Sequence, residues 1–121
     1  MTTSVKVALP NALVVVGDPS KCELPATMGE SLVAATISCI AIGCQSDADG
    51  ETDFTLGDAS DVDPGHLPIF EGNLLTPNRR IAVQSVLGAT ILETAVPRQQ
   101  TFVTVWVNDS TVPDQVIIGI A

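Results

Sequence analysis

The sequence predicts an all-β fold, an antiparallel β-sandwich or small barrel of about eight short strands with one long acidic loop. Three observations support this class. The apolar residues, 45% of the chain, are mainly Val, Ile, Ala and Leu, and Val and Ile favour pleated sheet. The apolar runs are short and are separated by Pro, Gly, Asn and Asp. Residues 101–107 alternate strictly, with Phe102, Thr104 and Trp106 on one face and three valines on the other.

The first strands are predicted at residues 5–9 and 12–16, with Pro10 and Asn11 between them. Residues 17–20 are Gly, Asp, Pro and Ser, each of which favours a turn. We expect the following segment, residues 21–30, to be irregular.

Residues 32–42 fit two structures. The segment 27–30 matches a helical capping box, and Gly43 would end such a helix. Four β-branched residues between these points oppose a helix, and apolar side chains fall on both faces of an extended chain, as in a buried strand. We therefore predict a strand here, with a helix as the alternative.

The acidic loop is predicted at residues 45–72, with room for a short strand near 53–56. Four more strands are predicted after it, at residues 80–86, 90–96, 101–107 and 116–120. The first two form a β-hairpin around Leu87 and Gly88. The chain has no repeat and no dividing linker, so residues 1–121 are predicted to form a single β domain.

The charge balance excludes several classes of partner. The chain has five basic residues against fourteen acidic ones, for a net charge of −9. Binding to nucleic acid or to an anionic membrane needs clustered Lys and Arg, so neither is expected. No apolar run is long enough to span a membrane, and the first residues do not resemble a signal peptide. We expect a virion protein, or a cytoplasmic one if the source is cellular.

Seven of the fourteen carboxylates lie between Asp47 and Asp63, without a Lys or Arg among them. Asp47, Asp49, Glu51 and Asp53 surround Gly50 with the spacing of hard oxygen ligands, which makes them a candidate calcium site. The match to an EF-hand is partial, because a third Asp before the Gly and a Glu at position twelve are missing. A solvated, negatively charged loop that aids solubility or docks on a basic partner is the favoured interpretation.

No enzyme is predicted. A zinc site needs four ligands, and the chain has that number in Cys22, Cys39, Cys44 and His66. Their spacing, however, contains no C-x2-C pair of the kind that forms a zinc knuckle. We expect the three thiols to be buried apolar groups, with a disulfide left open. His66 is the only histidine, and no G-x-S-x-G elbow supplies a serine for it. The basic pair Arg79-Arg80 is predicted to be exposed or to form salt bridges with the acidic loop.

The function predicted from composition is structural. Only 16% of residues are charged, and strands that are apolar on both faces need covering, so we expect sister copies to cover them. The prediction is a homo-oligomer, taken to be a trimer, that serves as a viral (phage) capsid decoration or minor structural protein. No cofactor is expected. The alternative is a calcium- or small-ligand-binding module that uses the acidic segment, residues 45–66.

Overall fold

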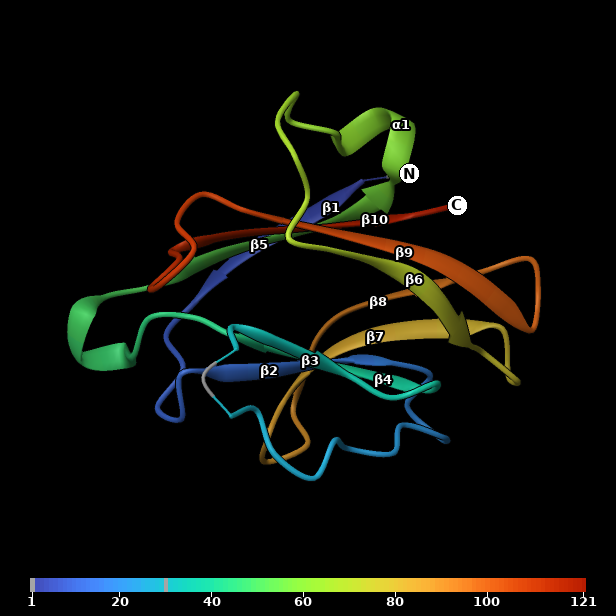
Figure 1. Ribbon diagram of the computed structural model, residues 1–121, viewed down its shortest axis with the longest axis horizontal. Coiled ribbons are helices and arrows are strands. Elements are labelled where there is room, and N and C mark those ends of the chain that lie inside the picture. Colours follow the sequence, from blue (N-terminus) through green and yellow to red (C-terminus); the bar gives the residue numbers. More distant parts are fainter. Residues whose placement is uncertain (1, 30) are drawn as a thin grey trace.

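The computed structural model describes residues 2–29 and 31–121, and within this part the chain forms ten strands in two five-stranded sheets (Figure 1). The all-β sandwich is confirmed. Sheet A contains, in spatial order, β1 (Thr3–Val7), β5 (Thr52–Asp58), β10 (Gln115–Ile120), β9 (Gln100–Val107) and β6 (Phe70–Leu75). Sheet B contains β3 (Val33–Ala35), β4 (Cys39–Gly43), β2 (Leu13–Gly17), β7 (Arg80–Ser85) and β8 (Thr90–Ala95). Two short helices, η1 (Asp47–Asp49) and α1 (Ala59–Val62), flank β5.

The core lies between the inner faces of the two sheets. Every second residue of a strand points inward, so Phe54 and Leu56 of β5 and Val103 and Val105 of β9 are buried there. Sheet B contributes the remaining half of the core, mainly Val14, Val16, Ile40, Ile42, Ile81 and Val83. The paired strands are antiparallel with one exception, β5 and β10, which run parallel from the Gln115–Asp53 pair to the Ile120–Asp58 pair.

The single strand predicted at residues 32–42 is wrong, because the segment is a hairpin of β3 and β4. Thr36 makes the turn between them. Its hydroxyl accepts hydrogen bonds from the backbone N–H groups of Ser38 (3.3 Å) and Cys39 (3.1 Å). These bonds stabilise a turn at a point where a continuous strand would pair its backbone with a neighbouring strand. Ile37 is exposed at the tip of this turn.

The long acidic loop was also predicted too broadly. Residues 45–72 contain η1, the seven-residue strand β5, α1 and the start of β6. The buried residues Thr52, Phe54 and Leu56 alternate with outward-facing ones, but the surrounding acids hide this period in the sequence. One of the inner strands of sheet A, between β1 and β10, therefore comes from the most acidic part of the chain.

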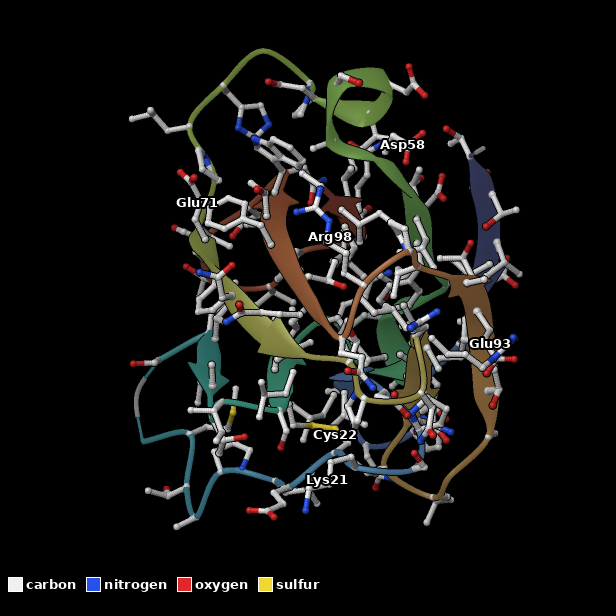
Figure 2. All side chains as sticks on the ribbon, turned by 90° about the vertical axis from the view of Figure 1, so that its right-hand side faces the viewer. Lys21, Cys22, Asp58, Glu71, Glu93 and Arg98 are labelled. Atoms are coloured by element: carbon white, nitrogen blue, oxygen red, sulfur yellow. A yellow bond between two sulfur atoms is a disulfide. The ribbon has the colours of Figure 1, made fainter. Side chains whose placement is uncertain are left out.

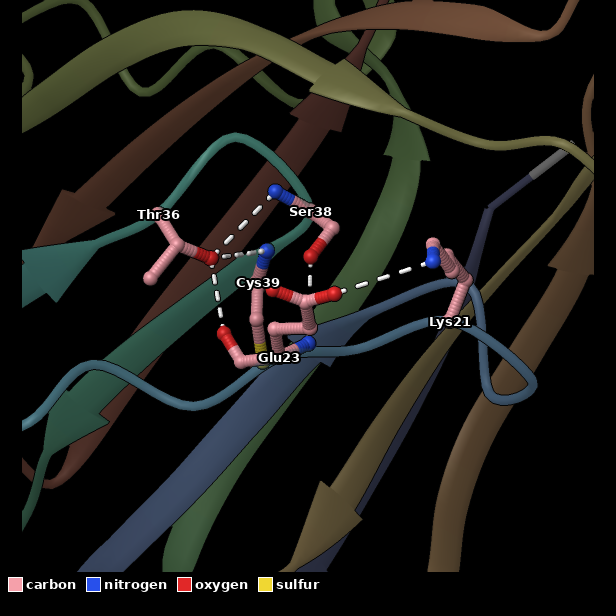
Figure 3. Close-up of polar contacts among 5 residues, drawn as sticks. All are labelled: Lys21, Glu23, Thr36, Ser38 and Cys39. Atoms are coloured by element: carbon pink, nitrogen blue, oxygen red, sulfur yellow. Dashed lines mark hydrogen bonds and ion pairs between the residues drawn. The ribbon is translucent and has the colours of Figure 1, made fainter.

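The outer face of sheet B is covered by the chain itself. Residues 18–29 run across it, and the Cys22–Cys39 disulfide holds them there, with a Cα–Cα distance of 4.7 Å (Figures 1 and 2). The hydroxyl of Thr36 donates to the Glu23 carbonyl oxygen (2.7 Å), and the Glu23 N–H donates to Ser38 Oγ (3.0 Å; Figure 3). The disulfide decides the pairing that the sequence left open, and the covering segment corrects the prediction that a sister copy is needed on this face.

The outer face of sheet A is covered at one end by α1. A Cβ atom at Gly119 would lie 2.9 Å from the Ala59 Cα and 2.8 Å from the Trp106 ring, so the glycine is what lets the helix pack against β10. Trp106 is only 4% exposed as a result. No helix in the described part of the chain has the length and apolar character that a membrane span requires.

Candidate functional site

The rest of the outer face of sheet A is open to solvent, and we call it the open face. Strand register defines its residues, because paired residues point to the same side of a sheet. Lys6 and Gln115 flank Asp53, while Ile117 lies between Thr55 and Trp106. Further along the strands, Thr104 lies between Gly119 and Glu71. The open face therefore has an apolar centre with polar groups at both ends.

One end of the open face is hollowed beneath α1 and the loop that follows it. This hollow, which we call the tryptophan hollow, has a volume of about 640 Å³. Its lining is Ala59, Ser60, Asp63, Gly65, His66, Leu67, Pro68, Glu71, Thr104 and Trp106. Glu71 stands on β6, across the opening from α1 (Figure 2).

Local hydrogen bonds set the walls of the tryptophan hollow. The Gly65 N–H donates to Asp63 Oδ1 (2.8 Å), and Gly65 has a φ of 90°, which a residue with a side chain would rarely adopt. The indole N–H of Trp106 donates to the His66 carbonyl oxygen (3.1 Å), so the loop is fastened to the sheet. Leu67 follows at the rim with 89% of its surface exposed.

Thr104 contributes a hydroxyl to the floor of the tryptophan hollow. The residue is 6% exposed, and within residues 2–29 and 31–121 its hydroxyl takes part in no hydrogen bond. The hydroxyl oxygen is not among the fully buried unpartnered atoms of the described residues, so solvent reaches it from the hollow. The floor of the hollow thus has a free donor and acceptor.

The other end of the open face has a second hollow of about 420 Å³, which we call the acidic hollow. It is lined by Lys6, Glu51, Asp53, Asn108, Asp114 and Gln115. The side chain of Asn108 fixes the adjoining turn, because its Oδ1 accepts from the N–H groups of Asp114 (3.2 Å) and Gln115 (3.1 Å). The Asp53 N–H donates to the Asp114 carbonyl oxygen (2.8 Å), which joins this turn to β5.

The two hollows together are strongly acidic. Two carboxylates line the tryptophan hollow and three line the acidic hollow, which makes five, and Lys6 is the one Lys or Arg in either lining. Two of the five, Glu51 and Asp53, are among the residues that the sequence pattern predicts as ligands. The pattern does not identify Asp63, Glu71 or Asp114 as site residues, because they come from separate segments that only the strand pairing brings onto one face.

The four predicted calcium ligands are spread along the chain from η1 to β5. Asp47 and Asp49 are exposed on η1, Glu51 is exposed beside the acidic hollow, and Asp53 is half-buried on β5. Among the described residues, no three His, Cys, Asp or Glu side chains are placed to hold a metal ion. The calcium site stays a prediction.

The remaining candidate residues do not converge. Cys22 and Cys39 are joined in the disulfide, so they do not supply thiolates for zinc. Cys44 is a free thiol in the core, where burial raises its pKa, while His66 lies at the tryptophan hollow. Arg80 pairs with Glu93 of β8 at 2.8 Å and not with the acidic segment.

Comparison with known proteins gives a likeness of fold. No model of a protein family matches the sequence. No curated protein matches it either. The solved structure of ComJ from Bacillus subtilis, an inhibitor of the DNA-degrading activity of NucA, matches with a TM-score of 0.71 at 12% identity, over 98% of this chain and 93% of ComJ. A crocagin biosynthetic protein, gene product J, matches with a TM-score of 0.54 at 9% identity, over 99% of this chain and 96% of that one.

These neighbours overturn the predicted role as a capsid decoration or minor virion protein. They are an enzyme inhibitor and a biosynthetic protein, and neither is a virion component. The physical reason for the error lies in the outer faces. The prediction assumed that their apolar residues needed sister copies, but residues 18–29 and α1 cover much of them within one chain.

Proposed function

We propose that this protein binds and inhibits a partner protein with a basic functional surface, of the kind that a nuclease uses to hold its substrate. The observation that carries the proposal is the match to ComJ along nearly the whole chain, combined with an acidic open face. The likeness to ComJ supports a fold that can bind a partner protein. The negative charge of the open face supports a partner whose binding surface is basic.

Electrostatic complementarity favours this class of partner. An enzyme that acts on nucleic acid must contact phosphates with Lys and Arg, so its substrate surface is positive. A chain of net charge −9, with five carboxylates around two hollows, would be attracted to such a surface and would occupy the space of the substrate. Attraction of this type raises the association rate and weakens as salt is added.

The open face is also the better of the two outer faces for docking. Its side chains stand on five paired strands, so little ordering entropy is lost when a partner binds. The corresponding face of sheet B is occupied by residues 18–29 and the disulfide. Self-association as a trimer is a separate prediction, which sedimentation at micromolar concentration measures.

The experiment starts by immobilising the chain and passing over it a lysate of the organism that encodes it. Proteins eluted by a salt gradient are identified, purified and assayed for DNA degradation with and without free chain. We expect a basic nuclease to be retained and to lose activity in proportion to the added chain. If excess chain leaves DNA degradation by the lysate and by every retained protein unchanged, the proposal is refuted.

A matched pair of variants locates the binding face. Asp53→Asn with Glu71→Gln removes two charges from the open face, and Glu23→Gln with Glu93→Gln removes two from the sheet B side. The first pair should weaken inhibition about tenfold, while the second should leave it nearly unchanged, since rim charges act over short distances at physiological salt. Equal effects of the two pairs would show that net charge alone matters.

A further inference from the structure

We infer that the tryptophan hollow receives an arginine side chain of the partner, an inference that depends on the proposed function for the identity of the site. Interfaces concentrate their binding energy in a few desolvated pockets, and Arg is among the residues that most often fill them. The tryptophan hollow has the apolar, acidic and neutral polar groups that an arginine side chain requires.

The apolar part of the lining suits the stem of the side chain. Ala59, Pro68 and Trp106 present carbon surface, and Leu67 extends this surface at the rim. The three methylenes of an arginine can be buried against such a surface while the guanidinium reaches polar groups. The indole N–H of Trp106 is already used by the His66 carbonyl, so Trp106 contributes packing surface and not a competing donor.

The polar part of the lining consists mainly of acceptors. Asp63 and Glu71 are carboxylates that accept only, and one oxygen of Asp63 is already fixed by the Gly65 N–H. The ring of His66 contacts the Leu67 carbonyl through Nδ1 (3.1 Å). Because a carbonyl only accepts, Nδ1 carries a proton in this contact. An anionic ligand would be repelled here.

The hydroxyl of Thr104 distinguishes this hollow from a simple cluster of acids. It belongs to a nearly buried residue on the floor, has no hydrogen-bond partner among the described residues, and is reached only from the hollow, so it is free to accept from a donor that enters there. Arginine carries five N–H donors in a planar fork and no acceptor, which matches acceptors spread over β6, β9 and the 63–66 loop. Lysine, with three donors at one point, matches them less well.

The sequence itself provides the probe. Trp106 is the only tryptophan, and the chain has no tyrosine, so intrinsic fluorescence reports on this hollow alone. The purified chain is titrated at constant ionic strength with acetyl-Gly-Arg-Gly-amide, with the Lys analogue, and with the citrulline analogue, which has the shape of arginine without its charge. We expect a saturable fluorescence change in the millimolar range for Arg, a weaker one for Lys, and none for citrulline.

Variants assign the contacts. Asp63→Asn with Glu71→Gln should weaken Arg binding about tenfold or more, and the Asn keeps an oxygen for the Gly65 N–H so that the loop is preserved. Thr104→Val, nearly the same in shape, should weaken binding about fivefold or more through loss of the hydroxyl. Glu23→Gln with Glu93→Gln, on the sheet B side, removes the same charge away from the open face and should leave binding unchanged. Circular dichroism checks that each variant is folded.

The outcomes separate this inference from the proposed function, because the titration needs no partner. Equal responses to the Arg and citrulline peptides, or no saturable response, would overturn the arginine site even if a nuclease is inhibited. Selective Arg binding that is lost in the Asp63 and Glu71 variant would support the site even if no lysate nuclease is inhibited.

Discussion

Removing the Cys22–Cys39 disulfide is expected to lower the free energy of unfolding by about 3 kcal/mol. The two cysteines are 17 residues apart, and closing a loop of that length in the unfolded chain removes entropy worth about 3 kcal/mol near room temperature. The variant is Cys22→Ala with Cys39→Ala. Alanine is chosen because Cys39 is fully buried, and a serine there would add an unpaired hydroxyl.

The cover on sheet B should loosen in this variant without leaving the sheet. The hydrogen bonds between Glu23 and the Thr36–Ser38 turn remain, so the segment 18–29 keeps one attachment beside the lost one. Val15 and Ala41 lie beneath the cover and should gain exposure. Hydrogen exchange of β2 and β4 would detect this loosening as faster exchange than in the unmodified chain.

Urea unfolding followed by Trp106 fluorescence measures the loss. Reductant should destabilise the unmodified chain by the same amount and leave the double variant unchanged, which is the matched control. Thiol titration of the denatured chain should find one thiol, Cys44, before reduction and three after it. A difference of less than about 1 kcal/mol between the unmodified chain and the variant, or an effect of reductant on both, would refute the reasoning.

Three further predictions follow from other contacts. Burial alone would raise the pKa of Asp18, but hydrogen bonds from Ser20 and Asn78 outweigh it and leave the pKa below its usual value. Asp18→Asn should therefore reduce stability by about 1.5–3 kcal/mol in denaturant melts at neutral pH. This deficit should shrink as the pH falls below about 4, because a lowered pKa gives stability that is lost on protonation; a constant deficit would contradict it. Gly119→Ala should cost about 1–3 kcal/mol and shift the Trp106 emission, since the new Cβ would press on α1; unchanged emission and melting would show that α1 moves freely. Millimolar calcium should leave the melting temperature unchanged, since no three described ligands converge, and a clear rise would establish a site in the acidic segment.

The predicted strands are accurate where the sequence pattern is local. The hairpin predicted at residues 80–86 and 90–96 is found as β7 and β8, and the alternation of residues 101–107 is found in β9. Prediction failed where acids interrupted the pattern, as in β5, and where a polar turn lay within an apolar run, as at Thr36. The disulfide is not predictable from the spacing of the cysteines, because it depends on how a segment without strands crosses sheet B.

The candidate site was predictable only in part. The carboxylates of the acidic segment are evident in the sequence, but their division between η1 and the acidic hollow depends on the pairing of β5 with β10. The tryptophan hollow joins Trp106 to Glu71 through the register of β9 with β6, which links residues far apart in the chain. Thr104 has no distinguishing signal in the sequence, because its lack of a partner is a property of the folded surroundings.

The position of β10 has a consequence for how the protein folds. This strand lies between β5 and β9, and β5 also holds β1, so one sheet joins the earliest and latest strands of the chain. During translation, β5 and β9 must wait with unpaired backbone edges until residues 115–120 leave the ribosome. Such distant pairings close slowly, on a scale of about milliseconds to seconds, and open edges in the meantime are exposed to aggregation. Chaperone binding to nascent chains that stop before β10 would be the signature of that interval.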